Sequence, residues 1–180
     1  MLPVTGLREF NAVETVAQHT REILEYQLTD VSALGHASYM AVSELCGNAI
    51  EHGANPLGAC VAAARFEQPR RQVSIALGDL GVGIPEHLRQ RYPEWFDDCF
   101  AIAQALEPRI SGTGDAHRGN GFAETFEAAL ASALHAARVD IHAANGFVRA
   151  QFYGGIKKLE PFPAARFRRG TWISYDLVGM

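Results

Sequence analysis

The order of helix-like and strand-like segments constrains the fold of this 180-residue chain more than any other feature. Apolar residues at helical spacing predict one helix over 10–29. We expect a second helix over 32–52, which ends at Gly53 as helices commonly do. Two apolar segments, 59–66 and 72–79, follow and predict strands joined by a polar turn. The continuous apolar character of the first of them indicates either a strand that is buried on both faces or one that is flanked by helices.

The second half of the chain begins with a long irregular stretch. Residues 86–118 contain two short helical patterns and end in a segment rich in Gly and polar residues, which is typical of a mobile loop. An Ala- and Leu-rich pattern then predicts a helix over 122–138, followed by a hairpin with a type I′ turn at Asn145-Gly146. The Pro- and Arg-containing stretch 160–169 precedes a last strand at 171–178. This order indicates an α+β fold with a mixed sheet and helices on one face.

Composition restricts the class of protein. The length is sufficient for one domain with a sizeable core, so we expect a single domain over 1–180. A net charge of -4 argues against a nucleic-acid partner, and we interpret the basic cluster Arg166, Arg168 and Arg169 as a solvated loop. The three cysteines show no CxxC spacing, and we find neither a signal peptide nor an apolar run long enough to cross a membrane. We therefore expect a cytoplasmic protein without a membrane partner.

A polar line on the second predicted helix is the first candidate site. Glu44 and Asn48 are four residues apart and share a face, and His52 extends the line by another turn. A carboxylate can accept a proton from an attacking hydroxyl, and an amide oxygen is a ligand that Mg²⁺ accepts. The alternative is a solvated polar stripe on an amphipathic helix.

A second candidate follows the predicted strand 72–79. Asp79 ends this strand and precedes Gly81 and Gly83. A carboxylate there could accept a hydrogen bond from an adenine amine, while the glycines let backbone approach the ring. The alternative is an acidic turn after a strand.

Two glycine motifs complete the set. Arg118, Gly119, Asn120, Gly121 and Phe122 open the helix predicted over 122–138, where free backbone N–H groups suit a polyphosphate. Gly170-Thr171 opens the last strand and is uninformative in isolation.

The order ExxxN, DxGxG, GxG before a helix, and GT before a final strand resembles the nucleotide-binding module of the GHKL superfamily, which includes gyrase B, histidine kinases and MutL. Residues 44–53 resemble its N box, 79–85 its G1 box and 117–122 its G2 box. The resemblance implies a two-layer α/β sandwich of the Bergerat type that binds ATP with Mg²⁺. The stretch 86–118 falls where that superfamily has its mobile ATP lid.

The resemblance also implies roles for single residues. Glu44 is the candidate base, and Asn48 is the candidate Mg²⁺ ligand. Asp79 would read the adenine amine, supported by the G1-box residues Gly81, Gly83 and Ile84, and Thr171 would contact adenine. The remaining cofactor-binding candidates are His52 and the G2-box residues Arg118, Gly119, Asn120, Gly121 and Phe122.

The branch within the superfamily depends on details of the boxes. Glu51 stands where histidine kinases often have Lys, and RGNGF resembles the G2 box of anti-sigma-factor serine kinases. Neither His19 nor His36 lies in a phospho-accepting motif. The resemblance therefore implies a serine/threonine kinase of partner switching, whose partner is a sigma factor or an antagonist-like regulator. The catalytic domain of a larger sensor kinase, a simple ATPase, a non-catalytic ATP-gated module and a homodimer stay open.

Overall fold

The computed structural model describes most of the chain, namely residues 2–7, 9–27, 32–52, 60–67, 72–108, 110 and 136–178. Its elements are, in chain order, β1 (Leu2–Leu7), α1 (Phe10–Gln27), α2 (Ser32–His52), β2 (Cys60–Glu67), β3 (Gln72–Gly78), α3 (Ile84–Arg89), α4 (Asp98–Ala105), β4 (Ala136–Tyr153) and β5 (Ile156–Val178). The predicted helices at 10–29 and 32–52 and the strands at 59–66 and 72–79 are confirmed in type and approximate place. The strand β1 was not expected.

The described strands form one five-stranded sheet in the order β1-β2-β3-β5-β4. Each pairing between them is antiparallel. The sequence predicts a mixed sheet, and the described strands differ from that prediction. The last strand lies between β3 and β4, with Ile75 opposite Tyr175 and Tyr175 opposite Val139. This central position places Thr171, which directly precedes the part of β5 that pairs with β3, beside the end of β3.

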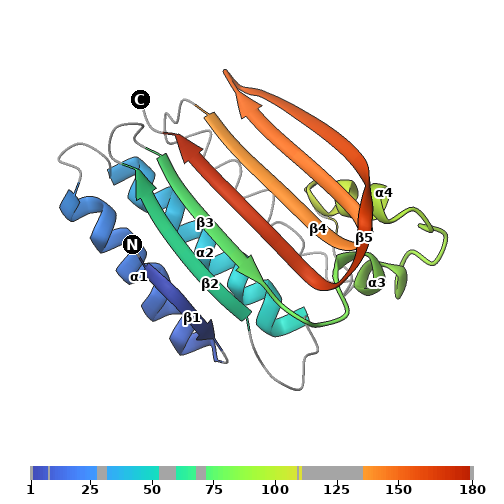
Figure 1. Cartoon of the computed structure of the whole chain (residues 1–180), viewed down its shortest axis with the longest axis horizontal. Helices are drawn as coiled ribbons and strands as arrows, with labels where there is room; N and C mark the ends of the chain where they lie inside the picture. Colours follow the sequence, from blue (N-terminus) through green and yellow to red (C-terminus); the bar gives the residue numbers. More distant parts are fainter. Residues whose placement is uncertain are drawn as a thin grey trace.

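One face of the sheet carries the hydrophobic core. Alternate residues of β3, β4 and β5 are buried there, as period-2 strands require. The long helices α1 and α2 pack together and cover this face, as Figure 1 shows, and their buried residues join the same core. The two layers and the α+β class that the sequence predicts are therefore confirmed, with helices on one face. None of the helices in the described part of the chain combines the length and apolarity needed to span a bilayer.

The strand β4 doubles back on itself at Ala144. Its pairing with β5 shifts between Ala143 and Gly146, and Ala144 has a φ of 51°. Figure 1 shows both β4 and β5 folding back beyond this point. The ion pair between Asp140 and Arg149 requires this reversal, because a straight strand would separate them by about 30 Å. The sequence predicts a hairpin whose two strands are joined at Asn145-Gly146, but both halves of β4 pair with β5, and Ala144 rather than Asn145 or Gly146 carries the positive φ.

A second turn closes the ribbon that β4 and β5 form. Gly154 and Gly155 both have positive φ and join Tyr153 to Ile156, which lie opposite each other. At the fold, β4 advances from Ala143 to Gly146 while its partner β5 must cover the stretch from Pro163 to Thr171. β5 therefore takes the longer, outer path, and the residues 160–169 belong to a strand rather than to a loop.

The helix predicted over 122–138 is wrong at its end. Ala136, Ala137 and Arg138 already belong to β4 and pair with Val178, Leu177 and Asp176. Helix propensity of Ala is a weak preference, and pairing with the last strand overrides it. The stretch 122–135 lies outside the described residues.

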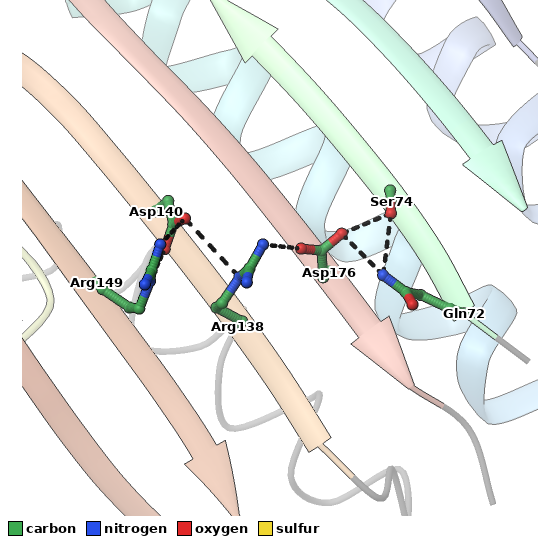
Figure 2. A network of polar contacts seen from close by, with 6 residues as sticks. All are labelled: Gln72, Ser74, Arg138, Asp140, Arg149 and Asp176. Atoms are coloured by element: carbon green, nitrogen blue, oxygen red, sulfur yellow. Dashed lines mark hydrogen bonds and ion pairs between the residues drawn. The ribbon is translucent and has the colours of Figure 1, made fainter. Parts of the chain in front are cut away.

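The other face of the sheet is polar and carries a continuous network, shown in Figure 2. Asp176 accepts hydrogen bonds from Ser74 at 2.5 Å and from Arg138 at 2.9 Å. Asp140 accepts two from Arg149, each at 2.8 Å, which join the two halves of β4. Gln72 completes the network through Ser74 and Asp176. The charged side chains of this network are thus paired with one another.

Two short helices connect the end of β3 to this ribbon. The sequence predicts short helices at both places, and α3 and α4 confirm them. Arg89 binds the carbonyls of Trp95 and Phe96 and the carboxylate of Asp98, while Asp98 also accepts the N–H of Asn145. This part of the predicted lid region is therefore a small packed unit that rests on the fold of β4.

Candidate functional site

Asp79 and Thr171 form the centre of the candidate site. Asp79 directly follows β3, and Thr171 directly precedes Trp172–Val178, the part of β5 that pairs with that strand. The N–H of Asp79 donates to the carbonyl of Thr171 at 3.0 Å, and the N–H of Thr171 donates to Oδ2 of Asp79 at 3.3 Å. The sequence motifs DxGxG, which is weak evidence alone, and GT, which is uninformative alone, therefore meet in space.

The carboxylate of Asp79 is held from its own loop as well. Oδ1 accepts the N–H of Gly81 at 2.7 Å, and the residue is only 6% exposed. An ionised carboxylate has about four acceptor sites, so two bonds leave capacity for a further donor. Burial raises the pKa of this carboxyl, and the N–H groups of Gly81 and Thr171 offset part of that effect.

Two glycines let backbone segments approach at this centre. Gly83 has a φ of 81°, and a Cβ there would lie 2.8 Å from the carbonyl oxygen of Gly170. Gly170 has a φ of 74°, and a Cβ there would overlap the backbone of Asp79. Larger residues fit at neither position, because both the conformation and the space exclude a side chain.

The start of α3 is tied to the same centre. The hydroxyl of Thr171 accepts the N–H of Ile84 at 3.3 Å. Gly83 is the N-cap residue of α3 and has no side chain that could cap the helix. The hydroxyl of Thr171 therefore satisfies one of the free N–H groups at this helix start. The five G1-box and last-box candidates Asp79, Gly81, Gly83, Ile84 and Thr171 are thus brought together by the fold.

The N-box candidates lie on α2. Glu44 and Asn48 are both partly exposed and one turn apart, whereas Ala41, Val42 and Leu45 are buried in the core. α2 packs against β2, β3 and β5, so this helix lies against the strands that carry Asp79 and Thr171. His52 is the last residue of α2, and its side chain lies outside the described part.

The G2-box candidates Arg118, Gly119, Asn120, Gly121 and Phe122 lie outside the described residues. Among the residues that the structure does describe, His, Cys, Asp and Glu side chains form no group of three or more that could hold a metal. An amide oxygen such as that of Asn48 fits Mg²⁺, which keeps several waters and needs few protein ligands.

Gly170 is the residue whose role sequence reasoning missed. The Gly-Thr motif predicts a role for Thr171 only. The signal was available in principle, since a glycine directly before a strand often has positive φ. Its contact partner, the backbone of Asp79, could not be inferred from local sequence.

No family model matches the sequence, and no curated protein matches it. Among solved structures, the 43K ATPase domain of Thermus thermophilus gyrase B is 16% identical, with 92% of this chain and 40% of that chain covered and a TM-score of 0.43. The B subunit of Myxococcus xanthus DNA gyrase is 14% identical, with 92% and 43% covered and a TM-score of 0.43.

The topoisomerase IV ATP-binding domain of Francisella tularensis is 12% identical, with 78% of this chain and 62% of that chain covered and a TM-score of 0.37. The chain thus spans between 40% and 62% of the length of these three structures. At such low similarity, the interpretation of the site depends on the geometry of this chain itself.

Proposed function

We propose that this chain binds ATP with Mg²⁺ and acts as a protein serine/threonine kinase in partner switching. The observation that carries the proposal is the meeting of Asp79 and Thr171, two residues of separate motifs, around a buried carboxylate with spare acceptor capacity. The buried Asp79 carboxylate lies between two close-packed backbone segments. It suits an exocyclic amine of a ligand, because it offers a directional hydrogen-bond acceptor that is shielded from water.

The remaining roles are assigned to α2 and the G2 box. Glu44 would take the proton of the attacking hydroxyl, and the γ-phosphoryl group would pass to that oxygen as ADP leaves. Asn48 would hold Mg²⁺, which neutralises charge on the β- and γ-phosphates when bound. The residues 117–122 would cradle the phosphates.

Calorimetry with ATP tests the pocket. Asp79→Asn replaces an acceptor oxygen with an N–H₂ group that would face the adenine amine, so we expect affinity to fall at least about tenfold. Glu22→Gln, on the solvent side of α1, removes a carboxylate elsewhere and should leave affinity unchanged. Equal ATP affinity of the wild type and Asp79→Asn would contradict the adenine assignment.

Asn48→Ala should reduce ATP affinity only when Mg²⁺ is present.

Phosphate transfer tests the reaction. Incubation with radiolabelled ATP and candidate partner proteins should label a Ser or Thr of the partner, and Glu44→Gln should abolish labelling while ATP still binds. Release of free phosphate without a partner would instead indicate an ATPase. Nucleotide binding with neither outcome would indicate an ATP-gated interaction module.

A further inference from the structure

The outer path of β5 carries an unusual group of side chains. We define the arginine arc as residues 162–172, which Figure 1 shows curving along one side of the molecule. Arg166, Arg168 and Arg169 are all exposed, and they are accompanied by exposed aromatic side chains, Phe167 at 66% and Trp172 at 43%. The arc contains no Asp or Glu.

The arginines of the arc differ from the other cations of the protein. Each of the other Lys and Arg side chains that the structure describes is engaged, in ion pairs at Arg21, Arg89, Arg138, Arg149, Lys157 and Lys158 and over the Tyr92 ring at Arg91. Within the same described residues, Arg166, Arg168 and Arg169 have no ion pair. Three unpaired cations within four residues of a chain of net charge -4 leave a local excess of positive charge.

The backbone of the arc is fixed, so its side chains are presented from an ordered surface. Nε2 of His142 lies 3.1 Å from the carbonyl oxygen of Arg166, and the indole N–H of Trp172 donates to the carbonyl of Arg169 at 3.1 Å. His142 and Trp172 lie opposite each other in the pairing of β4 with β5. The bend therefore does not have to be ordered when a ligand binds, which lowers the entropic cost of binding.

We propose that the arginine arc is the docking site for an acidic segment of a partner protein, in which carboxylates alternate with apolar side chains. Carboxylates of the segment would pair with the arginines, for which the guanidinium fork is well suited. Apolar side chains of the segment would cover Phe167 and Trp172. Because Arg169 directly precedes Gly170 and Thr171, the docked segment would lie beside the candidate adenine site.

A nucleic acid fits the same surface less well. Proteins that bind nucleic acids use about 6–10 phosphate contacts for strong binding, whereas the arc offers three arginines on an acidic protein. A short acidic segment needs only a few charge pairs and meets less long-range repulsion. The inference rests on the proposed function in one respect, that the ATP-binding protein has a protein partner.

Fluorescence anisotropy without nucleotide tests the site, so its outcome is independent of ATP binding. The probe is a labelled peptide in which glutamates alternate with leucines, and its matched control has glutamines in place of the glutamates. We expect the acidic peptide to bind at about 0.05 M salt, to weaken as salt is raised to about 0.3 M, and to bind more tightly than its control. The triple variant Arg166→Gln, Arg168→Gln, Arg169→Gln should lose affinity about tenfold or more.

A matched triple variant removes the same charge elsewhere. Arg21→Gln, Arg91→Gln, Lys158→Gln should bind the acidic peptide as the wild type does. Phe167→Ser, which keeps all charges, should weaken binding of the acidic peptide without changing the salt dependence of that binding. Equal losses in the two triple variants, no binding of the acidic peptide to the wild type, or tighter binding of an oligothymidine than of the peptide would each overturn the proposal.

Discussion

Asp79 and Thr171 exchange two hydrogen bonds although 92 positions of sequence separate them. This exchange ties the end of β3 to the start of the last strand segment and buries the Asp79 carboxylate between them. The approach is possible because Gly170, which precedes Thr171, has no side chain. The candidate site therefore depends on a contact between two backbones as much as on its polar groups.

Substitution of Gly170 should be more costly than substitution of another glycine with positive φ. Gly170→Ala introduces both left-handed strain and overlap with the backbone of Asp79, and we expect it to lower the free energy of unfolding by about 3 kcal/mol or more. Gly155→Ala is the matched control, since Gly155 has a φ of 80° and nothing within 4 Å of its added Cβ. It should cost about 1–2 kcal/mol. Equal losses in urea denaturation would show that the close approach to Asp79 is unimportant.

The stability of the protein should depend on pH through Asp79. Because burial raises the pKa of this carboxyl in the folded state, the folded protein binds the proton more tightly than the unfolded chain does. Stability should therefore fall as pH rises from about 4, the ordinary aspartate value, through the raised pKa. Asp79→Asn lacks this titration, so the wild type should lose stability relative to it over that window. Parallel curves of unfolding free energy against pH would contradict the expectation.

The local sequence predicts some of these elements well and others poorly. The helical spacing over 10–29 and the apolar segments 59–66 and 72–79 predict α1, β2 and β3, and the structure confirms these elements together with the expected helix α2. The stretch 160–169 contains two prolines and three arginines and was expected to be a loop, yet it belongs to β5. Its strand state comes from pairing with β4 at a distance in sequence, for example Phe162 with Phe147, which local patterns do not encode.

The candidate site shows the same division. The order of motifs identified Asp79 and Thr171, and the structure brings them together.

The local sequence strongly predicts a type I′ turn at Asn145-Gly146, but the positive φ falls on Ala144. Tertiary contact supplies a reason: the N–H of Asn145 donates to Asp98, and a Cβ at Gly146 would lie 2.8 Å from the backbone of Asp98. The packing of α4 sets this turn.

A double-mutant cycle should reveal the contact between Gly78 and Trp172. A Cβ at Gly78 would overlap the indole ring, so Gly78→Ala should lower the free energy of unfolding by about 1–3 kcal/mol. In a Trp172→Ala background the obstacle is gone, and the same substitution should be neutral or stabilising by up to about 1 kcal/mol, as Gly to Ala in a strand usually is. Urea denaturation of the four proteins gives the coupling. Additive effects would mean that the ring moves away at no cost.

Arg89 should hold the segment between α3 and α4 in place. Arg89→Met removes the bonds to the carbonyls of Trp95 and Phe96 and to the Asp98 carboxylate, and we expect amide hydrogen exchange across 95–100 to accelerate about tenfold or more. Arg91→Met is the neighbouring control, because Arg91 is exposed and lies over the Tyr92 ring. It should change exchange much less. Similar acceleration in both variants would show that general loss of charge, not the Arg89 bonds, is responsible.

The unequal paths of β4 and β5 around their common bend have a consequence for how this protein can vary. Both ladders that flank the bend are set by their own pairs, Ala143 with Thr171 on one side and Gly146 with Pro163 on the other. Residues added or removed on the outer path, between Pro163 and Gly170, would change the reach of the arc while leaving both registers in place. Relatives or engineered versions of this chain could therefore acquire a new partner through insertions there and retain the contact between Asp79 and Thr171.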